Sequence, residues 1–406
     1  MNKLSASLEI LHILETNGFE AYIVGGTVRD LALGLHFNDV DIATSASPGE
    51  ILSLFAEAKI IGDGQLCTVV IPQEKGWAVE VTPFQGAGLL DDLSRRDFTI
   101  NAMAMNRFGE LIDPFGGLLD LTRRVVRFNG RPEDRIKEDP IRCIRLFRFA
   151  ATLRGFVIDD LSWRATLENL PLFQEVPYER IGKEIYKALG GNFYSFMEAL
   201  EVAGYLPLIL PEIYALKGVP QDPGFHPEGD VYEHTKLCVK NAEALTSVSE
   251  IKAAAMFHDI GKPHTLTVDE EGVGHFYGHD RLGADMAKEA LKRLKAPNEL
   301  IEKVYSLVKE HMTHHAHFKD KGLKRLIGRV GSEEVFNLME LQKADIKCSN
   351  KKATKDHIIE REKRIKEILE NNEAYKISQL DIDGKDLMKL GFEEGPVLGK
   401  ILKYLL

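Results

Sequence analysis

Hydrophobic positions in the first 110 residues follow two different spacings. Residues 1–18 place hydrophobic side chains at helical intervals, which predicts an amphipathic helix. Four later segments are rich in β-branched residues and alternate in part, which predicts strands: AYIVGG (21–26), DVDIAT (39–44), CTVVIP (67–72) and WAVEVTPF (77–84). The segment TVRDLALGL (27–35), between the first two, has helical character. This part of the chain is therefore expected to mix helix and strand.

From about residue 135 the hydrophobic spacing becomes helical. It predicts helices within DPIRCIRLFRFAATLRG (139–155) and YERIGKEIYKALG (178–190). The proline- and glycine-rich segment 219–230 predicts a linker. A second helical region, rich in histidine, follows from about 231 to 350. Residues 350–373 predict a charged, solvated helix, and residues 377–406 predict a small helical module.

The composition is that of a folded protein with several domains. The 406 residues are 44% hydrophobic and 28% charged, and no hydrophobic run reaches the length of a transmembrane helix. The N-terminal segment lacks the cleavage site of a signal peptide, and four scattered cysteines predict reduced thiols in a cytoplasmic protein. The net charge of −10 argues mildly against a nucleic-acid partner. Arginines concentrate between residues 123 and 154, however, so a local basic groove on an acidic protein is an alternative.

Asp39 and Asp41 follow a glycine turn and are two residues apart. On a strand such residues face the same side, and neighbouring carboxylates repel unless a cation lies between them. Mg²⁺ fits, because it binds few protein carboxylates together with substrate phosphates. Gly25 and Gly26 let the backbone approach a phosphate, and Arg29 can neutralise its charge. The alternative is a turn followed by two surface aspartates.

The string GGTVRD (25–30) followed by DVD (39–41) resembles the polymerase-β-type nucleotidyltransferases, in particular the class II tRNA nucleotidyltransferases and the related bacterial poly(A) polymerases. Four further segments resemble later motifs in the family's order: RRDFTINAMAMN (95–106), DPFGGLLDL (113–121), EDPIRCIRLFRF (138–149) and ERIGKE (179–184). The resemblance extends to about residue 215. It implies an α+β head with a mixed sheet, in which catalytic Asp39 and Asp41 hold two Mg²⁺ ions while an RNA 3′-hydroxyl displaces pyrophosphate. It also implies that Arg96 contacts the nucleotide and that Asp97 helps to hold the sugar and the loop.

Four residues of the fourth motif recur at intervals of three: Asp139, Arg142, Arg145 and Arg148. We expect them along a slanting ribbon on one helix. Aspartate can accept from the amino group of cytosine or adenine, while arginine donates to the ring acceptors. The resemblance implies that Asp139 and Arg142 select the base and that Arg145 and Arg148 bind the nucleotide further. The alternative is an arginine-rich helix face paired with Glu133 and Glu138.

The connection QGAGLLDDLS (85–94) is short. In complete CCA-adding members of the family this connection is longer and carries a flexible loop, which members that add only two cytidines lack. The resemblance therefore implies a CC-adding enzyme that uses CTP, with full CCA addition from CTP and ATP as the near alternative. Poly(A) polymerase is a weaker alternative. A non-catalytic RNA-binding or nucleotide-sensing protein would not need the paired aspartates.

Histidines and aspartates in the C-terminal half form an ordered set. His258 and Asp259 are adjacent and can ligate one divalent transition metal with His234 and Asp345 from neighbouring helices. A metal-bound hydroxide can attack a phosphate ester, which Lys262 could bind. The set resembles the HD phosphohydrolase domain, and the resemblance implies phosphate contacts from Lys262, His279 and His311, with a 2′,3′-cyclic phosphate as a substrate. A purely structural domain is the alternative.

The resemblances together imply four domains: a nucleotidyltransferase head (1–125), an all-α neck that selects the base (126–218), an HD domain (219–350) and a helical tail (351–406). The partners implied are tRNA, held at its acceptor arm and elbow, and CTP or ATP. No membrane is expected as a partner. Recognition of tRNA is expected to rest on shape and backbone, since the deep groove of A-form RNA is hard to read.

Overall fold

The computed structural model describes residues 3–37, 39–62, 67–224, 226–348 and 352–405, so the outer ends of the predicted N-terminal, charged and tail segments lie outside the described residues. The chain divides into two compact units, 1–176 and 177–406, and each is described by itself. The division into four domains stays a prediction. No helix in the described part of the chain is long and apolar enough to cross a membrane.

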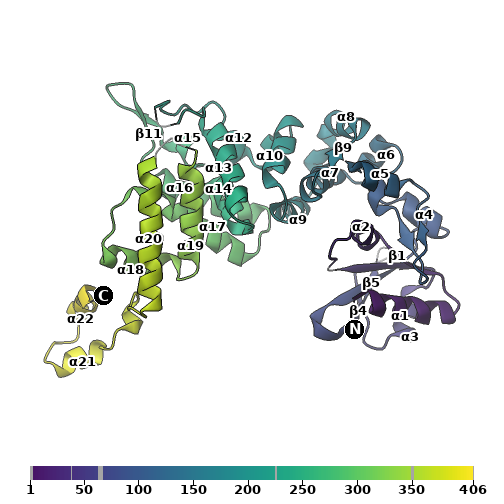
Figure 1. Ribbon diagram of the computed structural model, residues 1–406, viewed down its shortest axis with the longest axis horizontal. Helices are drawn as coiled ribbons and strands as arrows, with labels where there is room; N and C mark the ends of the chain where they lie inside the picture. Colours follow the sequence, from purple (N-terminus) through teal and green to yellow (C-terminus); the bar gives the residue numbers. More distant parts are fainter. Residues whose placement is uncertain (1–2, 38, 63–66, 225, 349–351, 406) are drawn as a thin grey trace. The chain divides into compact units, whose positions relative to one another are not determined.

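A seven-stranded mixed sheet forms the centre of the first unit (Figure 1). The strand order is β3-β4-β5-β2-β1-β6-β7; β2 and β5 are parallel, and the other neighbours pair antiparallel. The strands are β1 (Ala21–Val24), β2 (Val40–Thr44), β3 (Lys59–Ile61), β4 (Thr68–Pro72), β5 (Ala78–Pro83), β6 (Ala104–Met105) and β7 (Leu111–Ile112). The four strands predicted from the sequence are all present, and they carry the candidate carboxylates.

Short helices pack around this sheet because each buries one apolar side. α1 packs against β1 and β2, and Leu11 and Leu14 of the helix and Ile23 and Ile42 of these strands are all buried. Burial of such side chains contributes roughly 1.5–3 kcal/mol each. The helices are α1 (Lys3–Thr16), α2 (Gly26–Ala32), α3 (Pro48–Leu54), α4 (Leu89–Ser94) and α5 (Gly117–Arg123), with 3₁₀ helices at Glu74–Gly76 and Thr99–Asn101. α2 lies against β1 and β2, next to the candidate site.

The rest of the first unit is helical apart from a two-stranded parallel pair. Its elements are β8 (Val125–Val126), α6 (Pro132–Glu138), α7 (Arg142–Thr152), β9 (Val157–Ile158), α8 (Asp160–Glu168) and a 3₁₀ helix, Leu170–Glu175. The expected single helix for the fourth motif is wrong. Asp139 ends α6 with an extended backbone, because the residue before Pro140 is pushed out of the helical region. Arg142, Arg145 and Arg148 lie on a separate helix, α7, which begins at Arg142.

The second unit is almost entirely helical. It contains α9 (Tyr178–Leu189), α10 (Phe193–Val202), α11 (Leu206–Ile209), α12 (Pro211–Tyr214), α13 (Val231–Leu245), α14 (Ser249–Phe257), α15 (Lys262–Thr265), α16 (His279–Arg293), α17 (Asn298–Glu310), α18 (Asp320–Val330), α19 (Glu334–Ile346), α20 (Lys352–Glu370), α21 (Gly384–Lys389) and α22 (Pro396–Leu405), with a hairpin of β10 (Thr267–Val268) and β11 (Gly274–His275) and 3₁₀ helices at His311–His315 and Ile377–Gln379. α13, α14, α17 and α19 pack together as its core.

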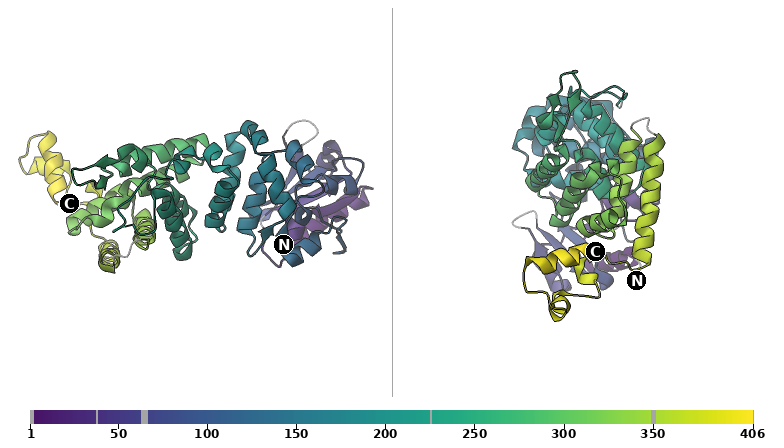
Figure 2. Two further views of the ribbon diagram at one scale, coloured as in Figure 1. Left: turned by 90° about the horizontal axis from the view of Figure 1, so that it is seen from above. Right: turned by 90° about the vertical axis from the view of Figure 1, so that its left-hand side faces the viewer.

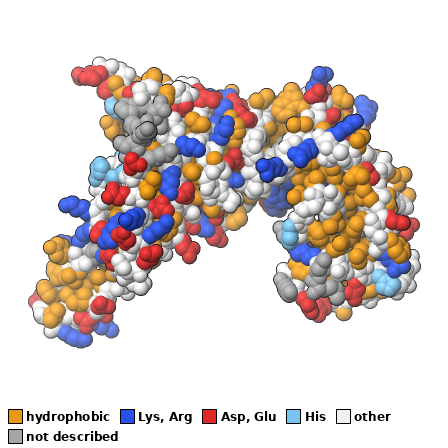
Figure 3. Space-filling model, viewed as in Figure 1, with side chains coloured by type: hydrophobic (Ala, Val, Ile, Leu, Met, Phe, Trp, Pro, Cys, Tyr) orange, Lys and Arg blue, Asp and Glu red, His pale blue; other side chains and the backbone are white. Residues whose placement is uncertain are grey.

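The charged helix α20 is not simply solvated, contrary to expectation. Ile358, Ile365 and Ile368 are fully buried against its neighbours α18 and α19. Arg361 is also buried and donates to the carbonyls of Thr313 and Ala316 at 3.1 and 2.6 Å. Charged side chains of both signs cover the side of α20 that is visible in Figure 3. The abundance of charge concealed an apolar stripe at spacings of three, four and seven, which is typical of a packed helix.

The tail forms a small module of its own. Leu387 of α21 packs with Leu398 and Leu402 of α22, and the two helices lie side by side (Figure 2). Several large apolar side chains of this module, including Leu390 and Tyr404, remain exposed. The predicted helical module is confirmed.

A close approach of two backbone segments holds the centre of the second unit. A Cβ placed on Gly261 would lie 2.3 Å from the carbonyl oxygen of His279 and 2.8 Å from the amide nitrogen of Gly283. Gly261→Ala is therefore expected to destabilise this unit by about 1–3 kcal/mol, because overpacked backbone must shift. Thermal unfolding of the variant checks this. Gly399→Ala, where no atom lies within 4 Å, is the matched control and should leave the midpoint unchanged or slightly raised.

Candidate active sites

Two aspartates stand at the start of β2, next to the first turn of α2. Asp39 lies one residue before the strand and is exposed, whereas Asp41 lies within it and is half-buried, so only Asp41 occupies the strand position expected of both. Thr27 of α2 fixes this segment: its hydroxyl donates to the carbonyl of Asp39 at 3.2 Å and accepts from the amide of Asp41 at 3.3 Å. The Gly-Gly turn and the aspartate pair are thereby held as one structural feature.

A third carboxylate, which sequence reasoning missed, stands beside them. Glu80 on β5 is the register partner of Asp41 on β2. Burial, the charge of Glu80 and, to a smaller extent, the charge of Asp39 raise the pKa of Asp41 to about 6, although Arg96 and Arg29 oppose the shift. Only the strand pairing brings Glu80 here. Knowledge that β2 and β5 are adjacent and parallel would have identified it as the acidic residue facing Asp41.

Gly25 is required where it stands. Its φ is +68°, a conformation that favours glycine, and a Cβ would lie 2.7 Å from a guanidinium nitrogen of Arg96 and 3.4 Å from Oδ2 of Asp41. Gly26 begins α2 and would bring a Cβ only into ordinary contact with Arg29. The Gly-Gly turn therefore lies directly against Asp41 and Arg96.

Two of the predicted arginines, Arg29 and Arg145, belong to one polar network. Arg29 donates to Asn101 at 2.8 Å, Asn101 donates to Asp97 at 2.9 Å, and Asp97 accepts from Arg145 at 2.8 Å. Although burial opposes it, Arg145 and the Asn101 amide hold the pKa of Asp97 below its ordinary value, so this carboxylate is a buried anchor. Arg96 is held separately, with its Nη2 3.0 Å from Asp92.

An aromatic ring, also missed from the sequence, gathers three of these cations. The guanidinium carbons of Arg148, Arg29 and Arg145 lie 3.8, 5.0 and 5.8 Å from the ring centre of Phe149. Cations within about 6 Å of an aromatic face are attracted to it. The ring thus supports a compact group of positive charges on α7 and α2.

The two residues predicted to select the base, Asp139 and Arg142, are positioned differently from the prediction. Asp139 and Arg142 lie on either side of the helix break, and the amide of Arg142 donates to the carbonyl of Asp139 at 3.1 Å. The guanidinium of Arg142 pairs with Glu138 at 2.8 Å and donates to the carbonyl of Arg95 at 3.1 Å. Of the glutamate pairings that the alternative expected, the one with Glu138 is present, and the hydrogen bond to the carbonyl of Arg95 holds Arg142 near the segment that carries Arg96.

The head carboxylates suit a bound cation. Asp41 is half-buried beside the exposed Asp39 and Glu80, and its raised pKa reflects its burial and the charges of these two neighbours. Among the described residues, the groups of three converging ligand atoms all lie in the second unit, so the head carboxylates form no closed cage. An open oxygen site is what Mg²⁺ uses when substrate phosphates complete its shell.

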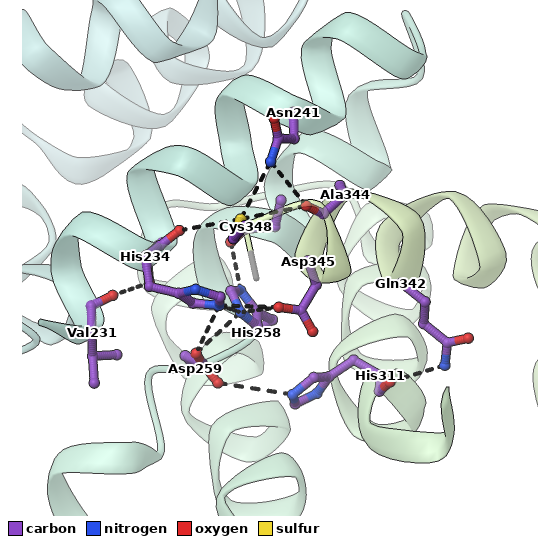
Figure 4. A network of polar contacts seen from close by, with 12 residues as sticks. Val231, His234, Asn241, His258, Asp259, His311, Gln342, Ala344, Asp345 and Cys348 are labelled. Atoms are coloured by element: carbon purple, nitrogen blue, oxygen red, sulfur yellow. Dashed lines mark hydrogen bonds and ion pairs between the residues drawn. The ribbon is translucent and has the colours of Figure 1, made fainter. Parts of the chain in front are cut away.

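The histidine cluster of the second unit is buried and convergent (Figure 4). Nε2 of His234 lies 3.0 Å from Asp345 and 3.2 Å from Nε2 of His258, and Nε2 of His258 lies 3.1 Å from Asp259. The sequence predicted these four residues as one metal set, and the structure brings them together from α13, the end of α14 and α19. His279 and His311 approach Asp259 from the other side, at 3.4 and 3.9 Å.

The expected linker 219–230 is instead a wall of this cluster. Glu228 accepts from Nδ1 of His234 at 2.6 Å, and Gln221 accepts from Lys262 at 2.7 Å. A carboxylate on the far nitrogen of a metal-binding histidine fixes its tautomer and orientation. Proline and glycine gave the segment the composition of a linker, but its Gln221 and Glu228 bond Lys262 and His234 of the cluster.

A cavity of about 420 Å³ opens onto the cluster. Its lining includes Asp259, Lys262 and the hairpin residues Phe276 and Tyr277. The ammonium of Lys262 lies 2.7 Å from Asp259, at the edge of the cavity. The cavity is therefore lined by residues of the histidine–aspartate cluster, by the Lys262 cation and by the aromatic side chains of Phe276 and Tyr277.

Comparison with known proteins decides the family. Residues 21–88 and 85–127 match the family described as the poly A polymerase head domain, and residues 231–348 match the HD domain. The multifunctional CCA protein of Hahella chejuensis is 33% identical over 318 residues, which cover 73% of this chain and 72% of that protein. The chain belongs to the CCA-adding enzyme family. The predicted family and fold class are confirmed, and the chain is a tRNA nucleotidyltransferase.

Other members of the CCA-adding enzyme family agree. The CCA-adding enzyme of Geobacillus stearothermophilus is 40% identical over 203 residues, 46% of this chain and 50% of that enzyme. The crystal structure of the Bacillus stearothermophilus CCA-adding enzyme in complex with CTP aligns with a TM-score of 0.70 and 26% identity, covering 100% of this chain and 92% of that one. Both matched domain types imply dependence on divalent metal ions.

Proposed function

We propose that this protein adds two cytidines from CTP to the 3′ end of tRNA, with release of pyrophosphate. The observation that supports it most is the meeting of Asp39, Asp41 and Glu80 beneath the Gly25 turn, with Arg96 against that turn. Nucleotide transfer needs metal ions at the point where phosphate charge develops, and carboxylate oxygens are the ligands that hold such ions. A binding protein would gain nothing from crowding carboxylates in this place.

Each group of the head has a distinct part in the proposed reaction. Asp39 and Asp41 would hold two Mg²⁺ ions, with Glu80 as a further carboxylate on the neighbouring strand. When bound, such ions lower the pKa of the attacking 3′-hydroxyl and neutralise charge on the leaving pyrophosphate. Arg29 and Arg96, beside the Gly-Gly turn, would bind the triphosphate.

The bases would be read by protein side chains in place of a template strand. Asp139 offers an acceptor and Arg142 a donor fork at the α6–α7 break, which match the amino group and the ring acceptors of cytosine. Arg145 and Arg148 would contact the nucleotide from α7, with Asp97 and Phe149 fixing their orientation.

The ionisation of Asp41 predicts an acid limit for this reaction. A carboxyl with a pKa of about 6 is protonated below that pH and then no longer binds a metal ion. At limiting Mg²⁺, kcat/KM should therefore fall about tenfold per pH unit below about pH 6. Saturating Mg²⁺ should move the limit to lower pH, since the ion displaces the proton. A pH profile that is flat down to pH 5, or that ignores Mg²⁺, would contradict this role of Asp41.

The loop after β5 supports addition of cytidines only. Residues 85–88 are few and tied down: Asp91 accepts from the amide of Ala87 at 2.8 Å, and Asp92 accepts from the amide of Gln85 at 3.1 Å. The two pieces of the head-domain match also meet at residues 85–88. A short, bonded loop cannot swing as the longer flexible loop of complete CCA-adding members does. We therefore favour CC addition over CCA addition.

An addition assay tests this directly. With tRNA lacking its 3′ end and both nucleotides present, products should extend by two cytidines and stop, as read on a sequencing gel. With tRNA already ending in CC and ATP alone, incorporation should be at least about 100-fold slower than the cytidine step. Efficient addition of the terminal adenosine by this chain alone would establish full CCA addition instead. Repeated adenosine addition would indicate a poly(A) polymerase.

We infer that tRNA is held by its backbone and shape along the arginine-rich elements and the tail. The tail module combines exposed apolar side chains with Lys385, Lys389 and Lys403, which suits the tRNA elbow. Phosphate contacts made by lysine and arginine release counterions, so binding should weaken with salt.

The second unit supports a further activity, hydrolysis of a phosphate ester. The convergence of His234, His258, Asp259 and Asp345 beside a cavity with Lys262 is the observation that favours it. A divalent transition metal bound there would supply a hydroxide at neutral pH. Lys262 would pair with the phosphate, and a 2′,3′-cyclic phosphate at a damaged tRNA end fits the setting of a tRNA-repairing enzyme.

A further inference from the structure

A buried arginine of α20 lacks an acidic partner. Arg361 is only 4% exposed, and its guanidinium donates to the carbonyls of Thr313 and Ala316 at 3.1 and 2.6 Å. Among the described residues, no carboxylate forms an ion pair with it. A buried charge is costly unless it is paired, and the ring of Phe318, 5.1 Å from the guanidinium carbon, compensates it only in part. Arg361 can therefore gain from an anion.

This arginine lines a cavity of about 390 Å³, whose walls come largely from α18 and α20, two helices labelled in Figure 1. Phe318 and Leu323 add apolar surface, and the ring of His357 borders the same space. The two carbonyls occupy two of the five guanidinium N–H groups of Arg361, which leaves others for a ligand. Cavities of roughly 300–1,000 Å³ are typical of small-molecule sites. The space is therefore suited to a molecule larger than a single inorganic ion.

Three carboxylates also line this cavity, and two of them are already bonded. Arg364 donates to Asp320 at 2.7 Å and to Glu367 at 3.0 Å. The third carboxylate, that of Glu360, belongs to an exposed side chain. Burial alone shifts the pKa of Arg361, and it lowers it. The acids in the wall therefore leave the charge of Arg361 uncompensated.

The start of α18 adds a second feature that attracts anions. This helix is 11 residues long, and the side chain of Lys319 at its N-cap makes no capping hydrogen bond. Asp320 and Leu323, both of the first turn, line the cavity. The first N–H groups of a helix have no partner within it, and they favour phosphate groups. A buried guanidinium and an uncapped helix start thus meet at one cavity.

We propose that this cavity binds a phosphate monoester of small-molecule size, such as a nucleoside monophosphate. Its phosphate would pair with Arg361 and with the exposed Lys363, which also lines the cavity. The planar fork of arginine matches phosphate oxygens in pairs. The apolar part of the ligand would lie against Phe318 and Leu323. This site is separate from the cavity beside the histidine cluster, which other residues line.

The test measures binding of labelled AMP to the full-length protein by equilibrium dialysis, with a chelator present to suppress binding that needs a metal ion. Lys363→Glu reverses an exposed charge and should spare the fold. We expect it to weaken one AMP site by at least about tenfold, because like charges brought together are unfavourable. Arg325→Glu is the matched control, since it reverses an exposed charge of α18 outside the lining, and it should leave AMP binding unchanged.

A crystal of the unmodified protein with 8-bromo-AMP then locates the nucleotide. The anomalous signal of bromine should lie in this cavity, with the phosphate on Arg361. Inorganic phosphate and tRNA are added as competitors at the site that Lys363→Glu weakens. Displacement by phosphate alone supports a free phosphate monoester as the ligand, and displacement by tRNA as well supports a phosphate of RNA in the same place. Unchanged AMP binding in Lys363→Glu, no bromine in the cavity, or no displacement by either competitor would overturn the proposal.

Discussion

Asp41→Ala is expected to lower the rate of cytidine transfer by about 10³-fold or more, while tRNA affinity changes less than about twofold. Metal-assisted charge stabilisation is worth several kcal/mol, and each 1.4 kcal/mol is about tenfold in rate. Affinity for tRNA depends on contacts to phosphates made elsewhere, so it should not follow the rate. Single-turnover incorporation of labelled CTP measures the first quantity, and filter binding of tRNA measures the second.

Two controls sharpen this result. Asp41→Asn keeps the size of the side chain and should lose nearly as much activity, which separates charge from packing. Glu57→Ala removes an exposed acid of the same unit and should leave the rate unchanged. If Asp41→Ala retains more than about a tenth of the activity, the carboxylate does not hold a catalytic ion. If tRNA affinity falls in parallel with rate, the loss comes from binding, and the non-catalytic alternative gains support.

His258→Ala is expected to abolish phosphate-ester hydrolysis while nucleotide addition continues. His258 is fully buried at the centre of the cluster, between His234 and Asp259, so its loss removes a ligand and leaves a void. The rate of opening of a 2′,3′-cyclic phosphate should fall by at least about 100-fold, since His258 would be a ligand of the metal that activates water. Release is measured on RNA with a cyclic-phosphate end, in the presence of Co²⁺, Ni²⁺ or Mn²⁺.

The outcome of this comparison separates the two units of the chain. Cytidine addition by His258→Ala within about twofold of the unmodified protein shows that the first unit is intact, and an unchanged melting midpoint of the variant shows the same for the second unit. His264→Ala, which changes an exposed histidine of α15 outside the cluster, should retain both activities. Absence of hydrolysis in the unmodified protein with each of these metals would leave the cluster without a hydrolytic role. Equal hydrolysis by His258→Ala would place the activity elsewhere.

The sequence predicted the parts of the head that depend on local spacing. Alternation gave the four strands, and the spacing of Asp39 and Asp41 led to the candidate centre, which stays a prediction. Glu80 could not be found in this way, because its relation to Asp41 depends on which strands pair. Asn101 was missed for the same reason, because it bonds Arg29, which is distant in the sequence. Phe149 follows Arg148 directly, but its contact with Arg29 depends on the fold.

The wrong predictions have local physical causes. The spacing predicts one helix from Asp139 to Arg148, which includes Pro140. A proline disfavours helical backbone in the residue before it, so the helix breaks at Asp139. The linker at 219–230 and the solvated helix at 350–373 were inferred from composition. Composition does not reveal that Glu228 bonds His234, or that Ile358 and Ile365 lie on one buried face.

The most direct test of the account is a crystal structure of the chain with CTP and Mn²⁺, in which anomalous scattering locates the ions. The account predicts ions bound by oxygens of Asp39 and Asp41, at roughly the 2.0–2.1 Å typical of hard octahedral cations, with the triphosphate between them and Arg96. Anomalous peaks away from both carboxylates, or aspartates that turn to solvent while CTP is bound, would contradict it.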